Sequence, residues 1–99
     1  LLQYDLQEVA VIDGLFIAIN KTRITQNFVK DIDSKHMYDI AFCLANLTDK
    51  NNKYKIGVTT NIRIAHNSIG ELDESWYKAR EQVNEMFGKF YPIDVTKDK

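Results

Sequence analysis

The chain has 99 residues, of which 44% are hydrophobic and 27% charged, and this size and composition are typical of one small globular domain with a single core. The same composition argues against intrinsic disorder, and the formal charge of -1 argues against a strong overall field that would attract nucleic acid or an anionic membrane. We therefore expect a single domain over residues 1–99.

Cysteine usage and the length of the apolar runs indicate where the protein works. Cys43 is the only cysteine, so no internal disulfide can form, as is usual in a reducing compartment. The longest apolar run, residues 9–19, is interrupted by Asp13 and Gly14 and is shorter than the ~20 residues that span a bilayer. The first residues lack the charged-then-apolar pattern of a signal peptide. We expect a soluble cytoplasmic protein without membrane contact.

Residues 1–24 predict a β-hairpin centred on Asp13-Gly14. Apolar runs at residues 9–12 and 15–19 flank this dipeptide, which suits a two-residue type I′ turn. Pairing across that turn would place apolar side chains on both faces of the hairpin. Both faces would then need to be covered.

Residues 25–35 leave two interpretations open. Phe28, Val29 and Ile32 have helical spacing, and Thr25 can cap a helix start. Acidic residues close to the end of this segment oppose the helix dipole. The segment is therefore either a short helix or an ordered connection.

Residues 37–48 and 53–64 predict a second hairpin, joined by a polar turn at residues 49–52. Residues 53–64 alternate large apolar side chains with polar ones, which is typical of a strand with one apolar face and one basic polar face. Residues 37–48 are apolar on both faces of the predicted strand. This strand is therefore expected in the middle of a sheet, covered on both sides.

The last predicted element is a helix from about Glu71 to Tyr91. Apolar residues recur there at steps of three and four, and polar residues occupy the opposite side. Ser68 and Glu71 have the form of a capping box, and Pro92 ends the helix. The predicted fold is α+β: a four-stranded antiparallel sheet made of two hairpins, with a long C-terminal helix packed on one face, in the order ββ(α)ββα.

Residue types that carry chemistry are few in this chain. Cys43 with His36 or His66 is the one possible pairing of a thiol nucleophile with a base, but a cysteine between alanines in a strand is typical of a core. The two histidines with Asp31 and Asp33 fit no metal-binding spacing. We therefore predict no catalytic, cofactor-binding or metal-ligating residue.

The most informative feature of the predicted fold is that its sheet has apolar side chains on both faces. One helix can cover only one of these faces. Either residues 25–35 cover the second side of the sheet, or another protein or a second copy of the chain does. We favour an interface that involves Phe16, Ile40, Phe42 and Leu44. The leading hypothesis is a non-enzymatic protein-binding domain of the accessory, inhibitor or immunity kind, which acts through a sheet face as a homodimer.

A module that binds single-stranded nucleic acid is the first alternative. Lys53, Lys55 and Arg63 would lie on the polar face of the strand at residues 53–64, where they could hold a phosphate backbone. Tyr54 is predicted on the opposite face, so the aromatic platform for stacking bases is incomplete. Binding of nucleic acid is therefore possible but not favoured.

A small α+β enzyme is the second alternative. Its pocket would lie between the C-terminal helix and the sheet, near Trp76, Tyr77 and His66. A polar group with a perturbed acid or base inside a ligand-sized cavity would indicate this function.

Overall fold

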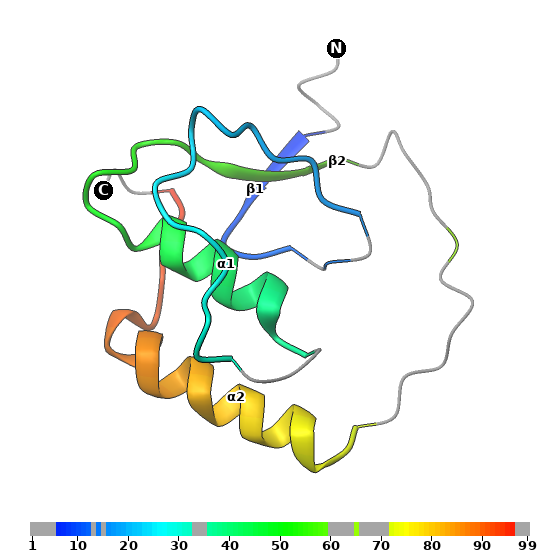
Figure 1. Ribbon diagram of the computed structural model, residues 1–99. Coiled ribbons are helices and arrows are strands. Elements are labelled where there is room, and N and C mark those ends of the chain that lie inside the picture. The colour runs from blue at the N-terminus through cyan, green and yellow to red at the C-terminus, as the bar shows by residue number, and fades with distance from the viewer. Residues whose placement is uncertain are drawn as a thin grey trace.

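The described part of the chain contains two α-helices, a two-stranded sheet and one 3-10 helix. The computed structural model describes residues 6–12, 14, 16–32, 36–59, 65 and 72–96. The elements in chain order are β1 (Leu6–Val9), α1 (Tyr38–Leu47), β2 (Ile56–Thr59), α2 (Glu74–Phe87) and η2 (Gly88–Phe90). They form three layers, with α1 between the sheet and α2 (Figure 1).

The sheet has two strands within the described residues, so the predicted four-stranded sheet is wrong. β1 and β2 are antiparallel, with Leu6 opposite Thr59 and Val9 opposite Ile56. One strand therefore comes from each of the two predicted hairpins. Gly14 and residues 16–24 form turns and irregular backbone, and the Gly14 N–H donates to Oδ2 of Asp39 on α1 at 2.6 Å.

The predicted strand at residues 37–48 is wrong, because this segment forms α1. Its side chains are apolar in nearly every direction, so a period of two does not distinguish a buried strand from a buried helix. A helix between two layers needs apolar side chains around most of its circumference. Ala41 and Leu44, which are both strong helix formers, are buried in the core.

The predicted long helix over residues 71–91 is wrong in its length. α2 has 14 residues, and η2 adds three residues in a tighter 3-10 conformation. Ser68 and Glu71, which were predicted to cap the helix, lie outside the described residues. Asp73 is the N-cap of α2. None of the helices in the described ranges has the length and apolar character to cross a membrane.

α2 packs on α1, so the predicted packing of the C-terminal helix on a sheet face is also wrong. Ala41 and Ala79 are fully buried and small, which allows the two helices to approach closely. Val58 on β2 remains 43% exposed, although its face of the sheet was expected to be covered. The core cluster consists of Ile32, Ala41, Leu44, Ala79, Val83 and Phe87.

Residues 25–32 form an ordered connection without a helix. Ile32 is buried in the core, and Val29 packs against it. These two side chains, which had helical spacing in the sequence, reach the core from irregular backbone. Residues 33–35 lie outside the described part of the chain.

Asp73→Ala is expected to destabilise the start of α2. Oδ1 of Asp73 accepts hydrogen bonds from the Ser75 hydroxyl at 2.5 Å and from the Trp76 N–H at 3.1 Å, and these two bonds lower the pKa of the carboxyl group. As the pH falls, the unfolded chain takes up a proton at this position before the folded protein does. The stabilisation by the Asp73 carboxylate is therefore complete above the pKa of an ordinary aspartate, and it is lost as the pH falls through the lower pKa of the folded protein. Thermal unfolding followed by circular dichroism at several pH values measures the effect.

Asp73→Asn is the matched control, because an amide oxygen can still cap the helix but does not titrate. At neutral pH it should unfold closer to the wild type than Asp73→Ala does. In acid, the midpoints of wild type and Asp73→Ala should converge. A constant difference between them at all pH values would contradict the assignment.

Candidate functional site

A groove of about 550 Å³ runs between α1, residues 17–24 and residues 52–57. We refer to this feature as the groove. Most of its lining is aliphatic or aromatic, which suits burial of an apolar ligand or side chain. The larger apolar side chains in the lining are Ile12, Ile17, Ile19, Ile24, Phe42, Leu47 and Ile56.

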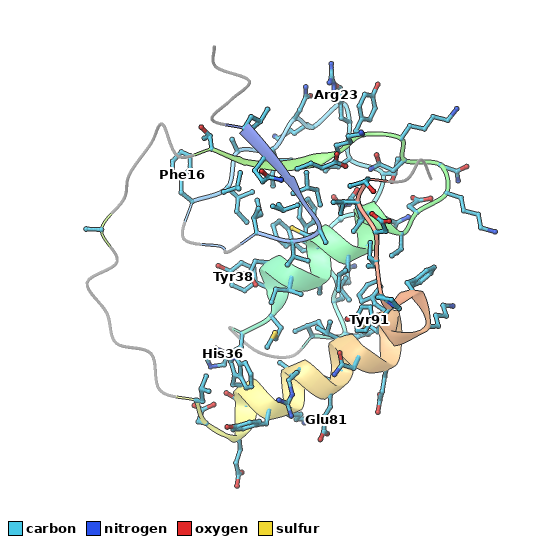
Figure 2. All side chains as sticks on the ribbon, turned by 180° about the vertical axis from the view of Figure 1, so that it is seen from behind. Phe16, Arg23, His36, Tyr38, Glu81 and Tyr91 are labelled. Atoms are coloured by element: carbon cyan, nitrogen blue, oxygen red, sulfur yellow. The ribbon has the colours of Figure 1, made fainter. Side chains whose placement is uncertain are left out.

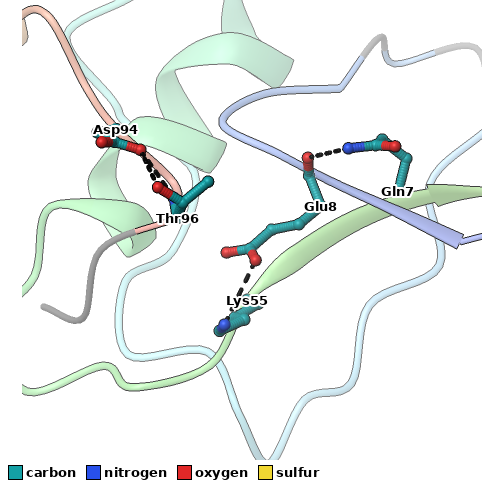
Figure 3. Close-up of polar contacts among 5 residues, drawn as sticks. All are labelled: Gln7, Glu8, Lys55, Asp94 and Thr96. Atoms are coloured by element: carbon teal, nitrogen blue, oxygen red, sulfur yellow. Dashed lines mark hydrogen bonds and ion pairs between the residues drawn. The ribbon is translucent and has the colours of Figure 1, made fainter.

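The rim of the groove is cationic and aromatic. It consists of Arg23, Lys53, Tyr54 and Lys55, all of which are exposed. The Arg23 guanidinium carbon lies 4.7 Å from the centre of the Tyr54 ring, within the range of a cation–π contact. Nζ of Lys55 lies 3.3 Å from Oε1 of Glu8 on β1 (Figure 3). The described lining has three cations and no carboxylate.

Asn46, a buried side chain of α1, joins the groove wall to the helix. Its Oδ1 accepts from the main-chain N–H groups of Thr25 at 2.9 Å and Gln26 at 3.0 Å. Its Nδ2 donates to the carbonyls of Gln26 and Phe42, both at 3.0 Å. The amide therefore replaces hydrogen bonds that the irregular backbone at residues 25–26 cannot make within a sheet or helix.

Asn52 extends this amide network to the rim. Its Nδ2 donates to Oδ1 of Asn46 and to the Arg23 carbonyl, both at 3.2 Å, and its Oδ1 accepts from the Tyr54 N–H at 2.9 Å. Asn52 is 4% exposed. The backbone of both rim residues that form the cation–π pair is thus fixed by one buried side chain. Sequence reasoning did not identify Asn46, Asn52 or Arg23.

Cys43 lines the groove but is a poor nucleophile. Its side chain is buried, and burial raises the pKa of the thiol, with a smaller contribution in the same direction from the nearby Asp39 carboxylate. A hydrogen bond from the Ile12 main chain acts in the opposite direction. The thiol therefore stays protonated at neutral pH, and the thiolate is the form that reacts.

Cys43 should react more slowly with an aromatic disulfide reagent in the folded protein than in urea. As the pH rises through the ordinary thiol range, the unfolded chain loses its proton first, so the free energy of unfolding should fall. Denaturation by urea across this range measures the fall, and Cys43→Ala should lack this component. Equal rates in folded and unfolded protein would contradict the burial of the thiol.

Of the two histidines considered as a base for Cys43, His36 is the one that the structure describes, and the groove lining that contains Cys43 does not include it. His36 lies near the start of α2 (Figure 2). Its Nε2 is 3.8 Å from Oδ1 of Asp73. His66 and Asp33 lie outside the described residues. Within the described ranges, no group of three His, Cys, Asp or Glu side chains is arranged to hold a metal ion.

The four predicted interface residues do not share one surface. Phe16, which is labelled in Figure 2, is 62% exposed, whereas Leu44 is buried in the core between the helices. Phe42 is buried against Phe28, with ring centroids 4.4 Å apart, and Ile40 is partly buried against the core. Their role in an interface stays a prediction.

Two of the three predicted nucleic-acid residues, Lys53 and Lys55, lie on the rim of the groove. Tyr54 lines the same groove, although the sequence predicted it on the face opposite the lysines. Arg63 lies outside the described residues.

Trp76 and Tyr77, which were considered for an enzyme pocket, do not line the groove. Their rings contact each other with centroids 5.0 Å apart, and the Arg80 guanidinium lies 5.3 Å from the Tyr77 ring. They therefore form an aromatic cluster on α2, on the layer furthest from the sheet (Figure 1).

No family model, curated protein or solved structure matches this chain. The residues of the groove therefore indicate its chemistry. These combine an apolar lining, an exposed tyrosine and three cations, with a buried amide network behind them.

Proposed function

We propose that the protein is a small non-enzymatic protein-binding domain, of the accessory, inhibitor or immunity kind, and that the groove holds a segment of its partner. The composition of the groove is the observation that supports this most. Arginine and tyrosine on the rim are residue types that dominate binding energy at interfaces, and the apolar lining can bury side chains of a partner. The protonated thiol of Cys43 also favours binding over nucleophilic chemistry at this site.

The groove replaces the sheet face as the proposed binding surface. The sheet face was favoured because residues 37–48 were expected to form a strand with two apolar faces, and these residues form the buried helix α1. A homodimer remains a separate proposal, supported by the exposed side chains of Phe16 and Val58. Multi-angle light scattering should give twice the chain mass of 11.5 kDa, and a mass of one chain would contradict the dimer.

Binding of single-stranded nucleic acid is the second candidate. It is supported by the position of Tyr54 beside Lys53 and Lys55, where an exposed ring and two cations could bind a base and its phosphates. This function requires affinity that falls steeply with salt and is lost when both lysines become alanine. A titration with oligothymidylate tests it.

Tyr54→Ala is expected to weaken binding of the protein partner by roughly tenfold or more, since truncated aromatic hot spots cost at least ~1.4 kcal/mol. The partner would be captured from the native host with the immobilised wild-type protein, purified, and titrated against wild type and variant by calorimetry. The ring is half exposed, so its removal should leave the fold intact.

Tyr77→Ala is the matched control, because Tyr77 is 45% exposed where Tyr54 is 50% exposed, and each ring has an arginine over it. The control should bind like the wild type. Equal affinity of wild type and Tyr54→Ala would contradict binding through the groove. Capture of nucleic acid alone would favour the second candidate.

A further inference from the structure

We infer that the partner segment held in the groove is an extended acidic peptide, whose apolar side chains fill the lining and whose carboxylates meet the cationic rim. This inference rests on the proposed function, and it specifies the chemistry of the partner. The charge of the groove, its apolar lining and the main-chain groups of its wall each support the inference.

The charge of the groove is opposite to that of the whole chain. The described lining contributes Arg23, Lys53 and Lys55 and no carboxylate, whereas the full sequence has 14 acidic and 13 basic residues. Glu8 lies outside the lining and already neighbours one of the three cations, Lys55. Complementary charge across an interface raises the association rate and selects the partner, so acidic side chains are the expected match.

The lining and the rim differ in the kind of group that they accept. Most of the larger apolar side chains in the described lining are isoleucine or leucine, and these pack well against aliphatic side chains. The three cations, Arg23, Lys53 and Lys55, belong to the exposed rim. A ligand that satisfies both regions needs an apolar anchor with carboxylates next to it, which a short stretch of peptide supplies.

The groove wall also offers main-chain groups to a peptide. Within the described part of the chain, no hydrogen bond is formed by the main chain of Ile17, Ala18 or Ile19. Ala18 and Ile19 are exposed. An extended segment can form hydrogen bonds to these main-chain groups, as a peptide does when it binds at an exposed sheet edge.

The arrangement of Tyr54 favours a peptide over a nucleic acid. Stacking of bases requires open aromatic faces, and the Arg23 guanidinium occupies one face of the Tyr54 ring at 4.7 Å. The described lining contains one further aromatic side chain, Phe42, and this is 6% exposed. The groove is therefore better suited to aliphatic side chains than to bases.

Selection of random peptides displayed on phage against the immobilised full chain tests the inference. Enriched peptides should carry aliphatic side chains next to aspartate or glutamate. For synthetic copies of these peptides, fluorescence anisotropy should show affinity about tenfold or more weaker for Lys53→Glu than for wild type. Lys78→Glu, an exposed lysine on α2, is the matched control and should bind like the wild type.

Each contrary outcome has a distinct meaning. The acidic partner would be overturned if the enriched peptides lacked carboxylates, or if they bound Lys53→Glu as tightly as the wild type. The proposed function would stay intact in that case if Tyr54→Ala still lowered the affinity for these peptides. If no peptide is found whose binding depends on Tyr54, both the acidic partner and the proposed function are overturned. If no such peptide is found, but oligothymidylate binds the wild type and binds Lys53→Glu more weakly, the ligand of the groove is a single strand of nucleic acid and not a peptide.

Discussion

Asn46→Ala is expected to lower the free energy of unfolding by about 3 kcal/mol, because it leaves several polar groups without partners. The Asn46 side chain satisfies the N–H groups of Thr25 and Gln26, the Gln26 carbonyl and the amide of Asn52. These groups are at least partly buried, so water replaces the lost bonds only in part. Alanine has the better helix propensity, which offsets roughly 0.5 kcal/mol of the loss. Urea denaturation measures the change.

Asn51→Ala is the matched control for this substitution. Asn51 is exposed in the neighbouring turn, and its main-chain N–H, which alanine retains, donates to Asp49. Its removal should change the free energy of unfolding by less than about 0.5 kcal/mol. A similar small change for Asn46→Ala would show that the amide network does not support the groove wall.

Leu44→Ala is the second substitution with a large expected effect, a loss of roughly 2–5 kcal/mol in the free energy of unfolding. Leu44 is 4% exposed in the core that α1 shares with Val83 and Phe87 of α2. Truncation removes buried methyl groups and leaves a cavity between the helices. Because Leu44 was also predicted as an interface residue, the same experiment separates a core role from a surface role.

Leu72→Ala makes the same chemical change at a position that is 59% exposed. It should alter stability by less than about 0.5 kcal/mol. Leu44→Ala protein with wild-type stability but weakened self-association would contradict the core assignment and restore the interface prediction.

The elements whose apolar side chains recur at a regular spacing were predicted near their observed positions. Ala79, Val83 and Phe87 recur every four residues and are buried on one side of α2, as the apolar spacing indicated. β2 lies within the predicted strand at residues 53–64. The helix was predicted too long, since Leu72 and Phe90 fit the apolar spacing but are exposed.

The largest error came from the segment with the least periodicity. Between Tyr38 and Leu47 almost every side chain is apolar, so alternation and helical spacing fit equally well. Packing against α2 in the shared core favours the helix, and no local pattern contains this information. With that segment helical, β1 pairs with β2, so that one strand from each predicted hairpin contributes to the sheet.

The candidate site was predicted in part. Lys53 and Lys55 were identified from their position on a basic strand face, and they lie on the rim of the groove. Arg23 was missed because its role depends on Asn52, which is far from it in the sequence. One signal was present: Asn46 is an amide in a segment where Asp39 is the other strongly polar side chain, and a buried amide usually satisfies backbone groups nearby.

The groove exists as described only if Tyr38–Leu47 is the helix α1, since Phe42, Cys43, Asn46 and Leu47 form one of its walls. The ¹³Cα and ¹³Cβ chemical shifts of this segment in labelled protein test this most directly. We expect ¹³Cα shifts above and ¹³Cβ shifts below their random-coil values throughout the segment. Shifts of the opposite sign, as in a β-strand, would contradict the helix and remove the groove.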